Sequence, residues 1–143
     1  MANTKTTKAI YWTTTGFIFL FEGVLPALTG HTEFAKAGIR YLGYPEYFGT
    51  MLVIFKVLGC IALVIPAMPR RLKEWAYAGL GFVMISACIS YIAVDGFGGL
   101  AFFPLVVLGI LVTSYIYYTR LADARGASLT IKYSEHVVPG LSR

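Results

Sequence analysis

Four long apolar runs constrain this chain more than any other feature of its sequence. They cover residues 9–29, 46–68, 74–94 and 99–119. An α-helix needs about 20 mostly apolar residues to cross the hydrocarbon core of a bilayer. The runs are continuous and lack the alternation of apolar and polar residues that membrane β-barrels show. We therefore predict an all-α polytopic membrane protein, with a four-helix transmembrane bundle over residues 1–120 and a polar cytoplasmic tail over residues 121–143.

The composition argues against a soluble domain and against nucleic-acid binding. Hydrophobic residues make up 57% of the chain and charged residues 13%, and the mean hydropathy is +0.70. A soluble fold with so few charges would expose large apolar patches. The net charge of +5 comes from basic residues in the gaps between apolar runs, not from one stripe with stacking aromatics. We expect membrane lipid, and no nucleic acid, among the partners of this chain.

The distribution of basic residues predicts the orientation in the membrane. Short cytoplasmic loops are enriched in Lys and Arg. Two basic residues, Lys36 and Arg40, fall on one side of the four runs and nine on the other. The nine are Lys5, Lys8, Arg70, Arg71, Lys73, Arg120, Arg125, Lys132 and Arg143. We therefore place both termini in the cytoplasm, with the chain in a bacterial inner membrane. A cleavable signal peptide is the alternative for the first run, but that run exceeds the usual apolar length of about 7–15 residues.

Aromatic residues mark both expected membrane interfaces, where amphipathic rings are enriched. The predicted inner belt consists of Tyr11, Trp12, Trp75, Tyr77, Tyr115, Tyr117 and Tyr118. The predicted outer belt consists of Tyr41, Tyr44, Tyr47, Phe102 and Phe103. Both belts agree with the orientation inferred from the charges.

The outer segment 32–42 has the pattern of a short amphipathic helix that lies on the membrane surface. Thr32 can cap its start, and Gly43 can end it. Its lipid-facing side would consist of Phe34, Ile39 and Leu42.

The tail after Arg120 is polar, with one short patterned stretch. Leu129, Ile131 and Tyr133 alternate with polar residues. A period of two is typical of a strand, so we expect a short strand or a docking segment there.

Two ionisable residues fall inside predicted spans, Glu22 in the first and Lys56 in the second. A charged side chain at mid-depth costs about 2.5 kcal/mol or more, so such residues are candidates for function. At about 1.5 Å per residue, both lie near the middle or in the outer half of a core about 30 Å thick. Antiparallel neighbouring helices would bring them together. Two interpretations stay open, a ligand-binding site and a structural ion pair that fixes the register of the helices.

Polar and small residues recur at helical spacing on three predicted helices, which predicts a narrow pocket. The three stripes are Tyr11, Thr15, Glu22 and Thr29; Gly49, Lys56, Gly59 and Cys60; and Gly79, Ser86 and Ser90. If the stripes converge, Thr15, Ser86 and Ser90 line a pocket open toward the outer leaflet. Tyr91 and Asp95 would form its edge, although Asp95 has the simpler interpretation of a turn residue.

No motif assigns a chemical reaction to the chain. The sequence contains no C-x-x-C, P-loop, dinucleotide or haem-attachment pattern. His31 and His136 lie far apart in the sequence, and we expect no metal site. Cys60 and Cys88 fall about 10 Å apart in depth on antiparallel helices, whereas a disulfide needs Cα atoms within about 7 Å. We expect buried free thiols and no covalently bound cofactor, and we assign no catalytic residue.

Four segments give the chain a resemblance to the DoxX-like family of small four-helix membrane proteins. They are Phe21-Glu22-Gly23-Val24; Leu42-Gly43-Tyr44-Pro45 through Phe48; Lys56-Val57-Leu58-Gly59; and Leu72-Lys73-Glu74-Trp75-Ala76-Tyr77-Ala78-Gly79. The last two are the most specific. The resemblance covers most of the chain from about Lys8 to Tyr118 and leaves the tail without a counterpart.

The resemblance implies a four-helix bundle and an association with redox biology, but no catalytic residue. Relatives include a subunit of a thiosulfate:quinone oxidoreductase and a membrane partner of a bacterial oxidative-stress complex. Relatives often have a histidine near the end of the third span, where this chain has Tyr91. An activity that needs this histidine is therefore not implied here.

Our leading hypothesis is a small accessory subunit of a quinone-linked redox system, with a lipophilic-ligand pocket in its outer half. Lys56 would donate a hydrogen bond to a carbonyl-type oxygen, Glu22 would hold or exchange a proton, and Tyr91 would flank the ring. The alternative is a structural anchor or assembly subunit that binds a membrane partner, a cytoplasmic partner or further copies of itself. A small transporter is a third and weaker hypothesis.

Overall fold

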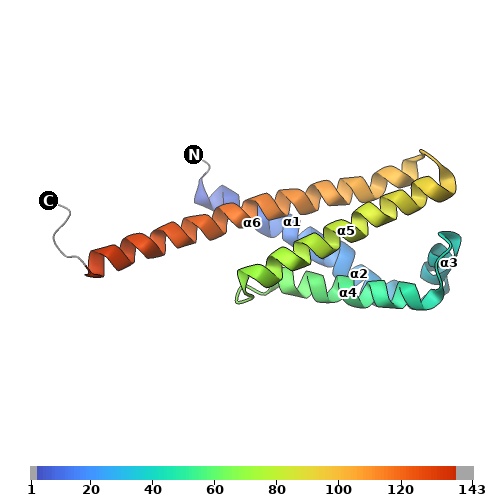
Figure 1. The fold of residues 1–143 in the computed structure, drawn as a ribbon, viewed down its shortest axis with the longest axis horizontal. Coiled ribbons are helices and arrows are strands. Elements are labelled where there is room, and N and C mark those ends of the chain that lie inside the picture. The colour runs from blue at the N-terminus through green and yellow to red at the C-terminus, as the bar shows by residue number, and fades with distance from the viewer. Residues whose placement is uncertain (1–2, 138–143) are drawn as a thin grey trace.

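The computed structural model describes residues 3–137, and every regular element within this range is a helix (Figure 1). The elements are α1 (Thr4–Ile18), the π-helix η1 (Phe19–Val24), α2 (Leu25–Thr29), α3 (Glu33–Tyr41), α4 (Glu46–Val64), α5 (Arg70–Asp95) and α6 (Gly99–Val137). Figure 1 shows the long helices running back and forth, with α3 and the α5–α6 turn at one end and the α4–α5 corner at the other. Arg143, one of the basic residues used for orientation, lies outside the described residues.

The first helical segment runs without a break from α1 through η1 into α2. Its start is capped by the side chain of Asn3, which accepts a hydrogen bond from the Lys5 N–H. The Leu25 N–H donates to the Leu20 carbonyl, five residues back. In an α-helix, the ring of Pro26 would clash with the carbonyl of Glu22. The wider π turns before Pro26 relieve this clash, and such turns often mark functional positions.

Helix α3 and the turn after it connect the first segment to α4. The Thr32 Oγ1 accepts a hydrogen bond from the Ala35 N–H at 3.3 Å and caps α3, as predicted. Gly43 has φ 83°, a left-handed conformation that reverses the chain before Pro45 starts α4. The position of α3 on a membrane surface stays a prediction.

Helix α6 continues well past the predicted fourth span. It has 39 residues and is therefore about 58 Å long, roughly twice the thickness of the hydrocarbon core. The predicted strand around Ile131 is wrong, because α6 includes this residue. Alanines between Leu121 and Ala127 favour extension of an existing helix, and a strand would have had no neighbouring strand to pair with among residues 3–137. The docking role of the tail stays a prediction.

The core lies where α1, α4, α5 and α6 pack together. Its most deeply buried side chains include Ile18, Leu63 and Cys60, each exposed by 1% or less. Many large apolar side chains remain on the outer surface; Phe82, for example, is 69% exposed. This distribution is typical of a bundle whose outer solvent is lipid.

Three helices, α4, α5 and α6, are each long and apolar enough to cross a membrane. The first segment is divided by η1, so none of its three pieces reaches that length alone. The chain is therefore an all-helical membrane protein within the described residues.

Candidate functional site

Glu22 lies at the wide turns of η1, directly against α4. Its side chain is only 6% exposed. Gly23 makes this close approach feasible, since a Cβ atom at Gly23 would lie 3.0 Å from the Cβ of Cys60. Glycine thus lets η1 pack against α4 at the level of the buried carboxylate.

Glu22 and Lys56 form an ion pair inside the bundle. The Lys56 Nζ lies 2.7 Å from the Glu22 Oε2, and the Lys56 side chain is 20% exposed. Apart from this ion pair, Oε2 has no polar partner among residues 3–137. At this short distance the two opposite charges compensate one another. The two residues therefore lie together, as the sequence predicted.

The pair lies on the wall of a cavity of about 340 Å³ in the half of the bundle nearer α3. We call it the larger cavity, because a smaller one lies nearby. Its lining comes from η1, α2, α3, α4, α5 and α6, and Tyr91 is part of it. Most of its wall is apolar, with side chains such as Leu25, Val53 and Met84. Concave apolar sites with a few converging polar groups are typical of small-molecule binding.

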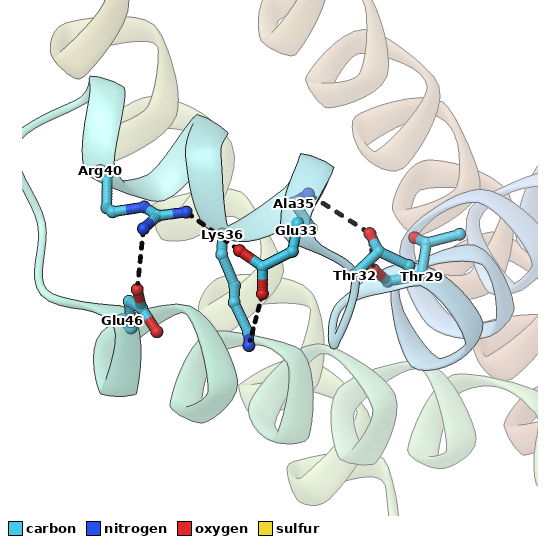
Figure 2. Close-up of polar contacts among 7 residues, drawn as sticks. All are labelled: Thr29, Thr32, Glu33, Ala35, Lys36, Arg40 and Glu46. Carbon is cyan, nitrogen blue, oxygen red and sulfur yellow. Dashed lines mark hydrogen bonds and ion pairs between the residues drawn. The ribbon is translucent and has the colours of Figure 1, made fainter.

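A polar network joins α3 to the start of α4 (Figure 2). Glu33 pairs with Lys36 at 3.1 Å and with Arg40 at 3.2 Å, and Arg40 also reaches Glu46 on α4 at 3.2 Å. Lys36 and Glu46 both line the larger cavity. The hydrogen bond and charge of Lys36, with a smaller effect of Arg40, hold the pKa of the exposed Glu33 below its ordinary value. These pairs attach α3 to the start of α4.

A second cavity of about 280 Å³ lies between α4 and α5, and the end of α3 with the turn after it closes one side. Lys56, Ser86, Ser90 and Tyr91 all line this α4–α5 cavity. The Ser90 hydroxyl donates to the Ser86 carbonyl at 2.8 Å and lies 2.9 Å from the hydroxyl of Tyr44. These four residues were predicted to share one pocket, and they do line one cavity. Lys56 and Tyr91 also line the cavity of about 340 Å³.

Thr15 and Asp95 lie away from both cavities. Thr15 Oγ1 lies 2.7 Å from Ser114 Oγ, between α1 and α6. Asp95 accepts a hydrogen bond from the Tyr41 hydroxyl, which connects the end of α5 to the end of α3. This hydrogen bond raises the pKa of Tyr41. The π turns of η1 and the orientation of Asp95 toward α3 explain why helical spacing alone misplaced both residues.

A second polar network joins α1, α5 and α6, and only its α1 residues were part of a predicted polar stripe. It comprises Tyr11 and Thr15 on α1, Lys73 and Tyr77 on α5, and Ser114 on α6. Lys73 Nζ donates to the Leu63 carbonyl at 3.1 Å and toward the Tyr11 hydroxyl at 3.5 Å. Tyr77 Oη lies 2.8 Å from Ser114 Oγ.

Three of these residues are almost fully buried. Lys73, counted among the basic residues of the predicted inner side, is 4% exposed, because its ammonium binds a carbonyl at the end of α4. Tyr11 and Tyr77 are each 5% exposed, and their place in an inner aromatic belt stays a prediction. The signal that was missed is the i, i+4 spacing of Lys73 with Tyr77, which places both on one helix face.

The described residues contain no disulfide and no cluster suited to a metal ion. Cys60 and Cys88 are both free and buried, as predicted. Among residues 3–137, no group of three His, Cys, Asp or Glu side chains is arranged to hold a metal ion.

Comparison with known proteins agrees with the helical architecture and with the segments noted in the sequence. No curated protein and no solved structure matches the chain. The model of the DoxX-like family matches residues 10–114, which is well over half of the chain and includes the Glu22–Lys56 pair and both cavities. The chain belongs to the DoxX-like family.

Proposed function

We propose that the chain crosses a bacterial inner membrane four times, with both termini in the cytoplasm. The first crossing would be the continuous path of α1, η1 and α2, whose 26 helical residues over positions 4–29 could extend about 39 Å. An even number of crossings agrees with the alternating directions of the helices in Figure 1. Helix α3 would lie on the outer membrane surface, and the inner end of α6 would project into the cytoplasm.

Within this topology, the protein acts as a small accessory subunit of a quinone-linked redox system. Its outer cavity holds a quinone or a similar lipophilic molecule. The observation that carries this proposal is that the Glu22–Lys56 pair is not sealed in the core but borders about 340 Å³ of mostly apolar space. A purely structural pair would need no such space beside it.

Each residue at the cavity has a distinct role in this proposal. The Lys56 ammonium has three N–H donors, and the ion pair leaves donors for a carbonyl-type oxygen of the ligand. The Glu22 Oε2, which accepts no hydrogen bond from residues 3–137, holds or exchanges a proton. Tyr91 lines the cavity and flanks the ring. Low-dielectric surroundings strengthen all of these polar contacts.

A structural anchor is the second candidate function, and the 2.7 Å separation of the pair favours it. In that role the ion pair fixes the register of η1 against α4, and the cavity is filled by bulk lipid. The inner loops and the projecting end of α6 would then bind a cytoplasmic or membrane partner. The two candidates differ in whether a defined molecule is retained.

Native mass spectrometry of the detergent-purified chain separates these candidates. It would be followed by extraction and identification of any small molecule that copurifies. Wild type is compared with Lys56→Ala and Glu22→Ala, and Lys132→Ala and Glu135→Ala are matched controls because both side chains are exposed on α6. We expect wild type and both controls to retain one defined molecule that the two cavity variants lose while still folded. If no molecule is retained and the cavity variants are only less stable, the anchor is the correct function.

A further inference from the structure

Two hydroxyl groups and one ammonium at the α4–α5 cavity have free hydrogen-bonding capacity. They belong to Ser86, Tyr91 and Lys56, which all line it. The Ser86 and Tyr91 hydroxyls make no hydrogen bond with protein among residues 3–137, and the Lys56 ammonium, paired with Glu22 at 2.7 Å, keeps further N–H donors. Polar groups in an apolar medium cost free energy unless they are hydrogen bonded. A ligand that supplies oxygen atoms here would bond to all three.

The neighbouring polar groups of the same cavity are already satisfied. The Ser90 hydroxyl bonds to the Ser86 carbonyl and to the Tyr44 hydroxyl. Ser86, Tyr91 and Lys56 are therefore the groups of this cavity that keep donors or acceptors for the polar part of a ligand.

The charges around the larger cavity indicate that the ligand is neutral. Lys36 is paired with Glu33, and Glu46 is paired with Arg40. Glu22 is paired with Lys56. Every charged side chain that lines either cavity thus has a counter-charge, so a net-charged ligand would have to break an existing pair.

The two cavities share part of their lining, namely Ile39, Leu52, Lys56, Ala87 and Tyr91. Phe82 also lines the α4–α5 cavity and is 69% exposed. In the proposed four-span topology, this exposed face would contact lipid. A molecule could then enter between α4 and α5 from the membrane.

We propose that the two cavities form one site for a neutral amphiphile whose oxygen-bearing head lies in the α4–α5 cavity. There the head hydrogen bonds to Lys56, Ser86 and Tyr91, and its apolar chain lies in the larger cavity. This inference rests on the proposed function and refines it. The ring stays beside Lys56 and Tyr91, which line both cavities, but on the α4–α5 side, and only the apolar chain fills the larger cavity. In this arrangement Ser86 and Tyr91 are specificity-determining residues.

The test titrates decylubiquinone into the detergent-solubilised full chain and follows its occupancy by native mass spectrometry. We expect Ser86→Ala and Tyr91→Phe each to weaken binding by about three- to tenfold, the usual effect of losing one hydrogen bond. Ser128→Ala and Tyr47→Phe are matched controls, because both side chains are exposed and lie outside both cavities. Decyl sulfate and decyltrimethylammonium carry the same chain with a negative or a positive head, and we expect weaker binding of both.

The outcomes separate this inference from the proposed function. If wild type binds decylubiquinone and the two hydroxyl variants bind it equally well, the head does not lie in the α4–α5 cavity, while the proposed ligand function stands. Equal or tighter binding of a charged probe overturns the neutral class. If no probe binds wild type, both this inference and the proposed function fail.

Discussion

Removing one charge of the Glu22–Lys56 pair should destabilise the bundle, whereas removing both charges should not. Glu22→Gln leaves the Lys56 ammonium without its carboxylate at 2.7 Å. Lys56→Met leaves a carboxylate that is 6% exposed. Breaking a buried pair from one side costs about 3–5 kcal/mol. Since the Lys56 side chain is 20% exposed, we expect the low end, about 3 kcal/mol, for each single change.

The double variant Glu22→Gln/Lys56→Met should recover most of this loss. No isolated charge remains in it, and replacing a whole buried ion pair is often close to neutral. We therefore expect the double variant to lie within about 1 kcal/mol of wild type, which corresponds to a large favourable coupling between the two sites.

The assay is unfolding by SDS in mixed micelles, followed by circular dichroism, for wild type and the three variants. The free energy of unfolding gives the coupling through a double-mutant cycle. If the losses of the two single variants simply add in the double variant, the residues do not interact, and the reasoning from the 2.7 Å contact is refuted.

Three further predictions concern other parts of the bundle. Gly23→Ala should cost about 1–3 kcal/mol, because its Cβ would lie 3.0 Å from Cys60, whereas Gly16→Ala, with open space, should be neutral or stabilising in the same unfolding assay. Tyr77→Phe should cost about 1 kcal/mol there by removing one buried hydrogen bond. Glu33 stabilises α3 while ionised, so its contribution should persist above the ordinary glutamate pKa and disappear as pH falls through its lowered folded value; hydrogen exchange of α3 should show this loss, and Glu33→Gln should not.

Each of these three predictions has a result that contradicts it. Equal effects of the two glycine substitutions would mean that η1 does not pack closely against α4. An unchanged free energy of unfolding in Tyr77→Phe would mean that the Tyr77 hydroxyl forms no stabilising hydrogen bond with Ser114. Identical pH profiles for wild type and Glu33→Gln would mean that the α3 network does not stabilise that helix.

The sequence predicted what depends on long-range regularity. Continuous apolar runs identified α4 and α5, with one end of each helix within one residue and the other end four residues off, since a bilayer requires both length and apolarity. Glu22 and Lys56 were paired correctly, because the cost of an isolated charge in lipid leaves few alternatives. Thr32 was also placed correctly, because capping depends on local chemistry alone.

Other features depended on contacts that spacing does not encode. In the first helical segment, the π turns of η1 rotate the side chains after Ile18 relative to their directions in an ideal α-helix. A lysine near a helix end is typical of a solvated charge, so the burial of Lys73 required knowledge of the Leu63 carbonyl beside it. The helical tail arose because α6 was already formed and needed only to be extended, which a period-two pattern of three residues could not reveal.

The most direct test of the central claim compares wild type with the charge-swapped variant Glu22→Lys/Lys56→Glu by native mass spectrometry. The swap preserves opposite charges at the same two positions, and it moves the ammonium from α4 to η1. Our account predicts that wild type retains one defined neutral molecule and that the folded variant does not. Retention by both proteins, or by neither, would contradict a ligand site organised around Lys56.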